Sequence, residues 1–185
     1  MNKTSLFYIV LFACSTNLLA DSPSFDFVEI GYTSVDIKGE SKNYVGYDLR
    51  GSYSLGDNFY IGGDAFSADI SGVFVRRQVV TIGVGYRTEL SSNNTVFAEL
   101  DGVVFNPHGN GNHENGFELT VGVRNKVTER LELKAVVEYF NTESYKTTTF
   151  VAGAAFEVFS SFALYSDFNI DSDDSRYSFG VRYSF

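Results

Sequence analysis

The two histidines of the chain are the residues with the clearest capacity for chemistry. His108 and His113 lie in a segment rich in Asn and Gly, and Glu114 follows the second histidine. Two imidazoles and a carboxylate are ligands that zinc accepts. A catalytic histidine instead needs a hydroxyl group and a carboxylate held beside it, an arrangement that we expect at a strand end and not in this loop. We therefore interpret the segment as a solvated turn, and we expect no catalytic residue, metal or cofactor.

Three further motifs carry weaker chemical signals. The acidic run Asp171–Asp174 lacks the Gly and the terminal Glu of a calcium loop. We interpret it as a solvated turn, with loosely bound divalent cations that bridge it to lipopolysaccharide as the alternative. Arg76 and Arg77 are either contacts for lipid phosphates or ordinary solvated surface. Gly83 and Gly85 are not a dinucleotide-binding motif, because we expect no helix after them.

Residues 1–20 have the features of a cleaved export signal. A cationic start is followed by an apolar run from Leu6 to Ala13, and Ala20 is a small residue at the expected cleavage site. The apolar run is shorter than the roughly 20 residues of a membrane-spanning helix. We therefore expect residues 21–185 to form the mature protein, as a single domain.

The composition favours strands and argues against nucleic acid as a partner. The chain has 23 Asp and Glu against 14 Lys and Arg, whereas nucleic acid is bound by an excess of Lys and Arg. It contains 18 Phe, 12 Tyr and 17 Gly but only 2 Pro, which is typical of β-structure. Cys14 lies inside the signal, so the mature chain would have no disulfide. Modification of Cys14 in a lipoprotein signal is the alternative.

From Phe25 onward, apolar and polar residues alternate with a period of two, which is the pattern of β-strands. Tight turns alternate with longer polar loops, as in an outer-membrane barrel whose two termini lie in the periplasm. We predict an all-β fold, namely a closed antiparallel up-and-down transmembrane β-barrel of about ten strands, with eight as the alternative. The predicted strands cover residues 26–35, 43–54, 58–69, 77–89, 95–105, 116–127, 131–142, 147–158, 162–170 and 175–185, and the longer loops cover 38–42, 70–76, 107–115, 142–146 and 171–176.

The alternation separates charged and apolar residues into two faces. One face carries no charge and is formed by residues such as Val28, Ile30 and Tyr32, whereas the other carries charges together with glycines. Because Arg or Lys facing hydrocarbon at mid-bilayer costs about 2 to 4 kcal/mol, we predict that the charges face the lumen. The predicted lumen charges are Glu29, Asp48, Arg50, Asp64, Arg87, Glu99, Asp101, Glu118, Arg124, Lys126, Glu132, Lys134, Glu138, Glu157, Asp167 and Arg182.

Alternation alone does not say which face is enclosed, because a water-soluble barrel or sandwich would bury the apolar face. The export signal and the glycines on the charged face favour a membrane barrel. So do the aromatic residues near the strand ends, which are typical of girdles at the membrane interface. The expected girdles consist of Tyr139, Phe117, Phe150, Phe168 and Tyr177 at the outer side and of Phe59, Tyr53, Tyr86, Phe156, Phe162 and Phe185 at the periplasmic side.

The last predicted strand alternates apolar residues with small or charged ones and ends on an aromatic residue. Tyr177, Phe179, Val181, Tyr183 and Phe185 carry this pattern, which resembles the terminal strand of outer-membrane barrel proteins. The resemblance implies that the barrel-assembly machinery reads this strand as an assembly signal. It also implies that the protein lies in the outer membrane of a Gram-negative bacterium.

The mature chain as a whole resembles the small OmpA- and OmpX-like barrels. The segments Phe27–Tyr32, Asp57–Tyr60 and Thr81–Tyr86 are most similar to the Ax-twenty-one type of small barrel. This family has no settled biochemical activity. The resemblance therefore implies a location and a fold rather than a reaction.

A ten-strand barrel has a backbone radius of roughly 10 Å, and its inward side chains leave at most a narrow channel. We expect a non-enzymatic structural or surface-interaction protein whose lumen is mostly plugged by the charged network. A narrow cation-preferring pore is the first alternative, and a lipid-modifying or proteolytic enzyme at the rim is the second. The expected partners are outer-membrane lipid, lipopolysaccharide and, during biogenesis, the barrel-assembly machinery. We expect a monomer.

Overall fold

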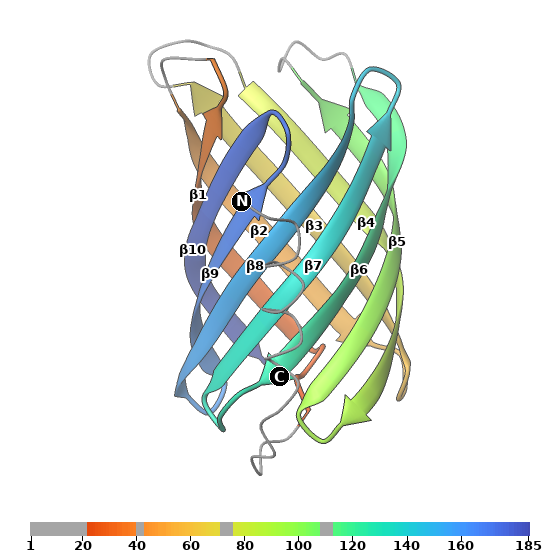
Figure 1. The fold of residues 1–185 in the computed structure, drawn as a ribbon, viewed down its shortest axis with the longest axis vertical. Helices are drawn as coiled ribbons and strands as arrows, with labels where there is room; N and C mark the ends of the chain where they lie inside the picture. Colours follow the sequence, from red (N-terminus) through yellow and green to blue (C-terminus); the bar gives the residue numbers. More distant parts are fainter. Residues whose placement is uncertain (1–21, 40–42, 71–75, 108–112) are drawn as a thin grey trace, which may run out of the picture.

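The computed structural model describes residues 22–39, 43–70, 76–107 and 113–185. Ten antiparallel strands form one closed barrel, in which each strand pairs with the next in sequence and the last pairs with the first (Figure 1). The strands are β1 (Phe27–Ile37), β2 (Tyr44–Ser54), β3 (Phe59–Ile70), β4 (Arg76–Ser91), β5 (Asn94–Asn106), β6 (Glu114–Lys126), β7 (Leu131–Thr142), β8 (Lys146–Phe159), β9 (Phe162–Ile170) and β10 (Asp174–Ser184).

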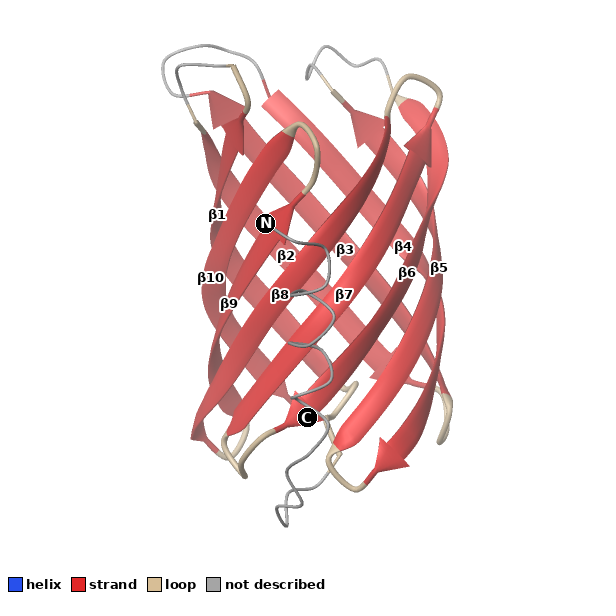
Figure 2. Cartoon of the chain, in the orientation of Figure 1, coloured by secondary structure: helices blue, strands red, loops and turns tan. Residues whose placement is uncertain are grey.

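The predicted closed barrel of ten strands is confirmed, and the alternative of eight strands is wrong. Each strand begins and ends within two residues of the predicted position, because the period of two persists to the strand ends. Figure 2 shows the described residues as strands and connections alone. Among these residues, no helix is long and apolar enough to cross a membrane.

The barrel has two ends that differ in their connections. The turn end holds the start of β1, the end of β10 and the turns after β2, β4, β6 and β8; the loop end holds the other connections (Figure 1). Two expected long loops are shorter than predicted, since residues 143–145 and 171–173 are tight turns. Backbone hydrogen bonds from Thr142 N to Tyr145 O and from Asp171 N to Asp174 O close them.

The barrel closes where β1 pairs with β10, from Phe27 opposite Ser184 to Ile37 opposite Asp174. Gly31 lies opposite Gly180 in the middle of this pairing. A Cβ atom at Gly180 would lie 2.1 Å from the backbone oxygen of Ile30, which is closer than any real contact. Glycine is therefore required at this point of the closure.

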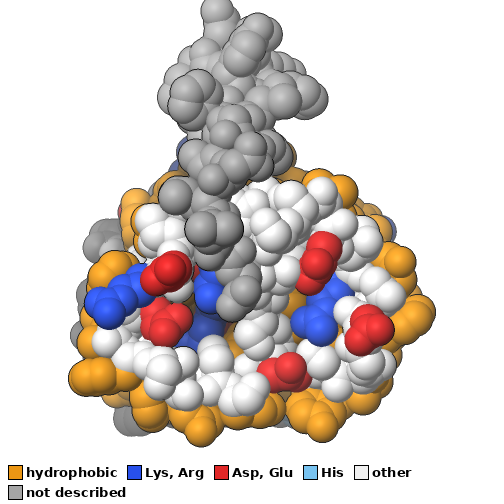
Figure 3. All heavy atoms as spheres, turned by 90° about the horizontal axis from the view of Figure 1, so that it is seen from below, with side chains coloured by type: hydrophobic (Ala, Val, Ile, Leu, Met, Phe, Trp, Pro, Cys, Tyr) orange, Lys and Arg blue, Asp and Glu red, His pale blue; other side chains and the backbone are white. Residues whose placement is uncertain are grey.

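The two predicted faces are confirmed, with the apolar face outside. Large apolar side chains point away from the barrel, including Tyr47 at 69% exposed and Ile82 at 73%. In the view from the turn end, most of the Lys, Arg, Asp and Glu side chains lie inside a ring of hydrophobic side chains (Figure 3). A water-soluble barrel would have the reverse arrangement. The exposed belt is the surface that a lipid bilayer stabilises.

The inner face carries more apolar side chains than the sequence led us to expect. Two apolar clusters line the lumen towards the loop end. One contains Val35, Tyr44, Phe66 and Ala68, and the other contains Val103, Phe105 and Phe140. Most of the predicted lumen charges lie in the middle of the lumen and towards the turn end.

Candidate functional site

The lumen holds a narrow cavity whose water-accessible volume is about 200 Å³. Its lining runs from Phe25 and Arg182 near the turn end to Tyr145 and Asp174 at the loop end. Because one water needs roughly 10 to 15 Å³ of such volume, the cavity has room for on the order of ten waters. The barrel therefore encloses a small cavity, lined by both charged and apolar residues, and not a wide channel.

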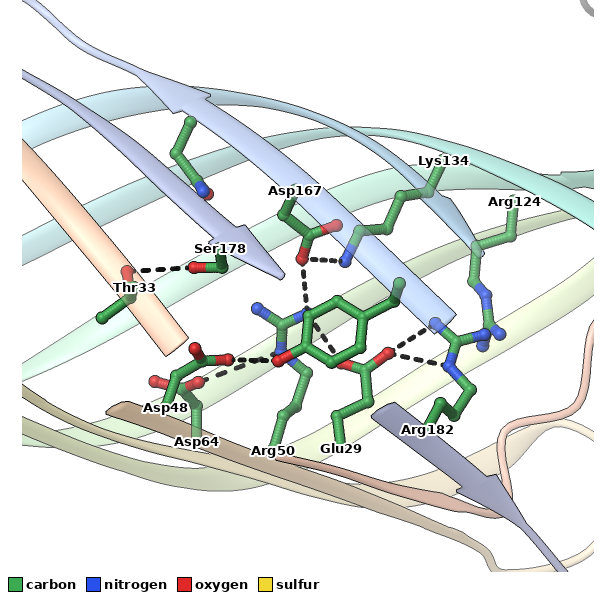
Figure 4. A network of polar contacts seen from close by, with 12 residues as sticks. Glu29, Thr33, Asp48, Arg50, Asp64, Arg124, Lys134, Asp167, Ser178 and Arg182 are labelled. Atoms are coloured by element: carbon green, nitrogen blue, oxygen red, sulfur yellow. Dashed lines mark hydrogen bonds and ion pairs between the residues drawn. The ribbon is translucent and has the colours of Figure 1, made fainter. Parts of the chain in front are cut away.

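Seven charged side chains, linked by ion pairs of 3.2 Å or shorter, form a connected set that we call the charge-paired network: Glu29, Arg50, Arg124, Glu132, Lys134, Asp167 and Arg182. Figure 4 labels these residues except Glu132. Glu29 is at its centre and is 0% exposed. Its two oxygens accept hydrogen bonds from Arg182, at 2.7 Å, and from Arg50, at 3.2 Å. Both arginines lie directly opposite Glu29 on the neighbouring strands, so the strand register places this group.

Two ion pairs of the network cross the lumen between strands that are not neighbours. Arg182 of β10 contacts Glu132 of β7 at 3.1 Å, and Arg50 of β2 contacts Asp167 of β9 at 3.1 Å. Arg124 also donates two hydrogen bonds to Glu132, at 2.8 and 2.9 Å. The network thus spans the barrel from wall to wall.

A glycine of β8 makes room for a third pair of the network. Lys134 of β7 reaches Asp167 of β9 at 2.7 Å across the inner face of β8. A Cβ atom at Gly153 would lie 2.2 Å from Asp167 Oδ1 and 2.5 Å from Lys134 Cε. Only glycine leaves the space in which this ion pair lies.

Four carboxylates on β5, β6 and β7 form a second region, which we call the acid wall: Glu99, Asp101, Glu118 and Glu138. All four line the cavity. Within the described parts of the chain, none of them forms an ion pair, and Asp101 Oδ1 is buried without a hydrogen-bond partner. Asp101 lies directly opposite Glu118. This side of the lumen is therefore negative, which favours cations.

The remaining predicted lumen charges lie on the inner side but outside both regions. Tyr165 donates a hydrogen bond of 2.7 Å to Asp48, and Asp64 lies 3.9 Å from Arg50. Arg87 donates to the backbone oxygen of Asp57 at the turn end. The structure does not bring these residues into the network, and it also leaves out Lys126 and Glu157 near the turn ends of β6 and β8.

The loop end holds an ion pair that the sequence analysis missed. Arg77 of β4 contacts Asp174 of β10 at 3.1 Å, and its guanidinium lies over the rings of Phe105 and Tyr145. The side chains of Arg77 and Asp174 are therefore not ordinary solvated surface, and contact with lipid phosphates stays a prediction. The alternation within β4 indicates the position of Arg77. It lies an even number of residues from Arg87, which is on the inner face, so both side chains lie on that face.

Two tyrosines and an arginine of the inner face were not among the predicted site residues. The hydroxyl of Tyr60 donates to Glu99 at 2.8 Å, and that of Tyr165 donates to Asp48. Arg176 of β10 lies over the ring of Phe66 and donates to Asn169 at 3.3 Å. Tyr60 and Tyr165 each lie an even number of residues from an inward charge of the same strand, so the alternation indicates that both point inwards.

The histidine loop is described only in part. His113 is exposed, and His108 lies outside the described residues. In the described portion of the chain, no group of three or more His, Cys, Asp or Glu side chains is placed to hold a metal ion. Asp171 Oδ1 accepts hydrogen bonds from the backbone N–H groups of Asp173 and Asp174, which shapes the turn before β10.

The residues of the predicted assembly signal all lie on the outer face of the barrel. Tyr177, Phe179, Val181, Tyr183 and Phe185 are exposed. Phe179 packs against Tyr32 of β1, and Tyr183 packs against Phe162 of β9. The last strand therefore presents a continuous aromatic and aliphatic surface to its surroundings.

No protein-family model and no curated protein sequence match the chain. Among solved structures, an outer membrane channel from Pseudomonas putida F1 superposes with a TM-score of 0.54 at 10% identity, covering 92% of this chain and 99% of that one. The KdgM porin in complex with disordered oligogalacturonate superposes with a TM-score of 0.51 at 14% identity, covering 85% and 99%. The chain therefore has the fold of outer-membrane β-barrel proteins.

Proposed function

We propose that the protein is an integral outer-membrane β-barrel of a Gram-negative bacterium, with a non-enzymatic structural or surface-interaction role and a lumen closed to solutes. The apolar belt and the enclosed charges support a position across a bilayer. In this orientation the turn end faces the periplasm. The observation that carries the proposal is the charge-paired network, because its ion pairs cross the lumen between β7 and β10 and between β2 and β9.

We expect the ion pairs of the network to stay formed at growth temperature, so that the lumen stays closed. Removing one partner of a buried ion pair typically costs about 3 to 5 kcal/mol, because the other charge is left uncompensated. Glu132 holds both Arg124 and Arg182. An opening that separated Glu132 from these arginines would therefore break two buried ion pairs at once and leave Arg182 with Glu29 alone.

Planar-bilayer recording tests this closure. We expect the purified wild-type protein to show no steady conductance, and Glu132→Ala to show discrete conductance steps. Glu157→Ala is the matched control, since it removes an inward carboxylate outside the network. A compact band that shifts on heating in gel electrophoresis reports that each variant is folded. Steady conductance of the wild type that survives stringent purification would overturn the closed lumen.

A narrow cation-preferring pore is the second candidate, and the acid wall is the observation that favours it. All four of its carboxylates line the cavity. The oligogalacturonate named with the KdgM porin is a polyanion, which such a wall would repel. If the lumen conducts, K⁺ should be preferred over Cl⁻, and the double variant Glu118→Gln/Glu138→Gln should lower that preference in the same recording.

The remaining expectations stand as parts of this proposal. The partners are outer-membrane lipid, lipopolysaccharide and the barrel-assembly machinery, which would read the exposed residues of β10. We propose a monomer, and we propose the Ax-twenty-one type as the group of small barrels to which the chain is most similar. An enzyme at the rim is disfavoured, because exposed His113 has no hydrogen bond to a carboxylate or hydroxyl group among the described residues.

A further inference from the structure

The segment before β1 folds into the mouth of the barrel at the turn end. Ser22–Asp26 precede the first strand and lie outside the sheet. Pro23 and Phe25 are nevertheless buried, with Phe25 only 3% exposed. Phe25 also lines the cavity of the lumen. An apolar side chain outside the sheet has therefore taken a position inside the barrel.

Phe25 is held there by two aromatic rings and two guanidinium groups. Its ring centroid lies 4.8 Å from that of Tyr60 and 5.7 Å from that of Phe97. The guanidinium carbons of Arg87 and Arg124 lie 4.8 and 4.5 Å from the same ring. These residues belong to β3, β4, β5 and β6, so one ring fills the space beside four strands of the wall.

Hydrogen bonds fix the segment on both sides of Phe25. Asp26 accepts from the backbone N of Ser54, at 2.6 Å, and from its hydroxyl, at 3.0 Å. On the other side, the hydroxyl of Ser22 bonds to Glu89 and to the backbone oxygen of Ser92. The segment thus runs across the mouth from the end of β2 to the turn between β4 and β5.

We propose that Ser22–Asp26 is a stopper, with Phe25 as its sealing side chain, that closes the turn-end mouth below the charge-paired network. The inference rests on the proposed function in that it treats the lumen as closed, and it adds a second closure in series with the network. The conductance expected of Glu132→Ala is then limited to brief steps, during which the segment withdraws. The stopper contributes no strand to the barrel, and side-chain contacts hold it in place. Withdrawal of the segment would therefore open the mouth while the ten strands stay paired.

Ser52 is the position that reports on the stopper alone. It is 9% exposed, lines the cavity and lies directly opposite Phe27, one inward position closer to the turn end than Arg50 of the network. Its hydroxyl is buried without a hydrogen-bond partner, so Ser52→Cys changes little. With Cys14→Ser as background, the introduced thiol is the only one in the chain.

The test measures the reaction rate of this thiol with a charged methanethiosulfonate reagent, using the purified full chain in detergent micelles. We expect slow reaction in the Ser52→Cys protein and at least tenfold faster reaction when Phe25→Ala is added. Phe59→Ala is the matched control, since it removes a phenylalanine from the outer face of the same end and should leave the rate unchanged. Asp26→Ala releases the anchor without touching the ring and should also raise the rate.

Fast reaction of Ser52→Cys in the otherwise unaltered chain would overturn the stopper, and so would equal rates with and without Phe25→Ala. If Phe25→Ala gives no heat-modifiable band, Asp26→Ala decides by the same criterion. Ser178→Cys distinguishes failure of the stopper from failure of the closed lumen. That residue is buried on β10, on the loop side of Arg182, so its rate should not respond to Phe25→Ala. A rate at Ser178→Cys that rises with Phe25→Ala would mean that the network does not close the lumen.

Discussion

The charge-paired network and the acid wall are built from the same kinds of residues on the same inner face, yet they behave differently. In the network, Glu29 has an arginine directly opposite it on each neighbouring strand. In the acid wall, Asp101 has Gly83 on one side and Glu118 on the other. The difference shows that strand register decides whether the charges of a region are paired with one another. The number of charges does not decide it.

The cavity lining reflects the same difference. The four bases of the network line the cavity, whereas its three acids lie behind them; all four carboxylates of the acid wall line it directly. Water can therefore stabilise the half-buried Glu99, Glu118 and Glu138 of the acid wall, although Asp101 is buried. The acids of the network depend on their partners. This distinction predicts which substitutions the barrel tolerates.

The largest effect is expected at the centre of the network. Glu29→Ala should lower the free energy of unfolding by about 3 to 5 kcal/mol, because it removes the buried carboxylate that Arg50 and Arg182 share and leaves each arginine with one acid of the network, Asp167 or Glu132. Glu118→Gln should leave it unchanged or raise it slightly, since it removes repulsion among carboxylates. Urea titration followed by the gel mobility of the folded form measures both, and suits a chain without Trp. Equal losses in the two variants would contradict the distinction.

A smaller effect is expected from glycines that face the two regions. Gly153→Ala should destabilise the barrel by roughly 1 to 3 kcal/mol, since the added carbon meets Asp167 and Lys134, which are held in ion pairs. The Cβ atom of Gly62→Ala meets the end of the Glu99 side chain at 2.6 Å. Glu99 is held by a hydrogen bond from Tyr60 and not by an ion pair, so the substitution should cost less than about 1 kcal/mol. The same titration ranks them, and the reverse order would show that the acid wall is the more rigid region.

The smallest effect is expected at the loop-end pair. Arg77 and Asp174 have side chains that are 20% and 17% exposed, and Arg77 keeps its contacts with Phe105 and Tyr145 when the carboxylate is lost. Asp174→Asn should therefore cost about 0 to 1 kcal/mol. The cost should fall further in 1 M salt, which screens exposed charges. A loss as large as that of Glu29→Ala, at either salt concentration, would place this pair with the network.

The barrel itself could be predicted from the sequence because alternation repeats on every strand. Each inward charge is an independent test of the same period, so an error at one residue does not shift the others. The alternation alone thus places Glu29, Asp101 and Arg182 on the correct face. The connections were less predictable, since Glu143–Tyr145 is polar like a long loop but closes as a tight turn.

The pairing inside the lumen could not be predicted, because it depends on contacts between strands that are distant around the barrel. Nothing local links Glu132 to Arg182 or Arg50 to Asp167. The stopper was missed for a related reason, since Phe25 lies before the first predicted strand and its aromatic partners come from other strands. Alternation places a side chain on a face, but the width of the barrel and the slant of its strands decide what the side chain meets there.

The pairing of β1 with β10 has a consequence for how the protein must be made. Phe27 lies opposite Ser184, so two edge strands stay unpaired until nearly the whole chain is available. The unpaired backbone groups of such edges promote aggregation. Contacts between residues so remote in sequence also form slowly. We therefore expect the chain to be most prone to aggregation before its final strand can pair with the first.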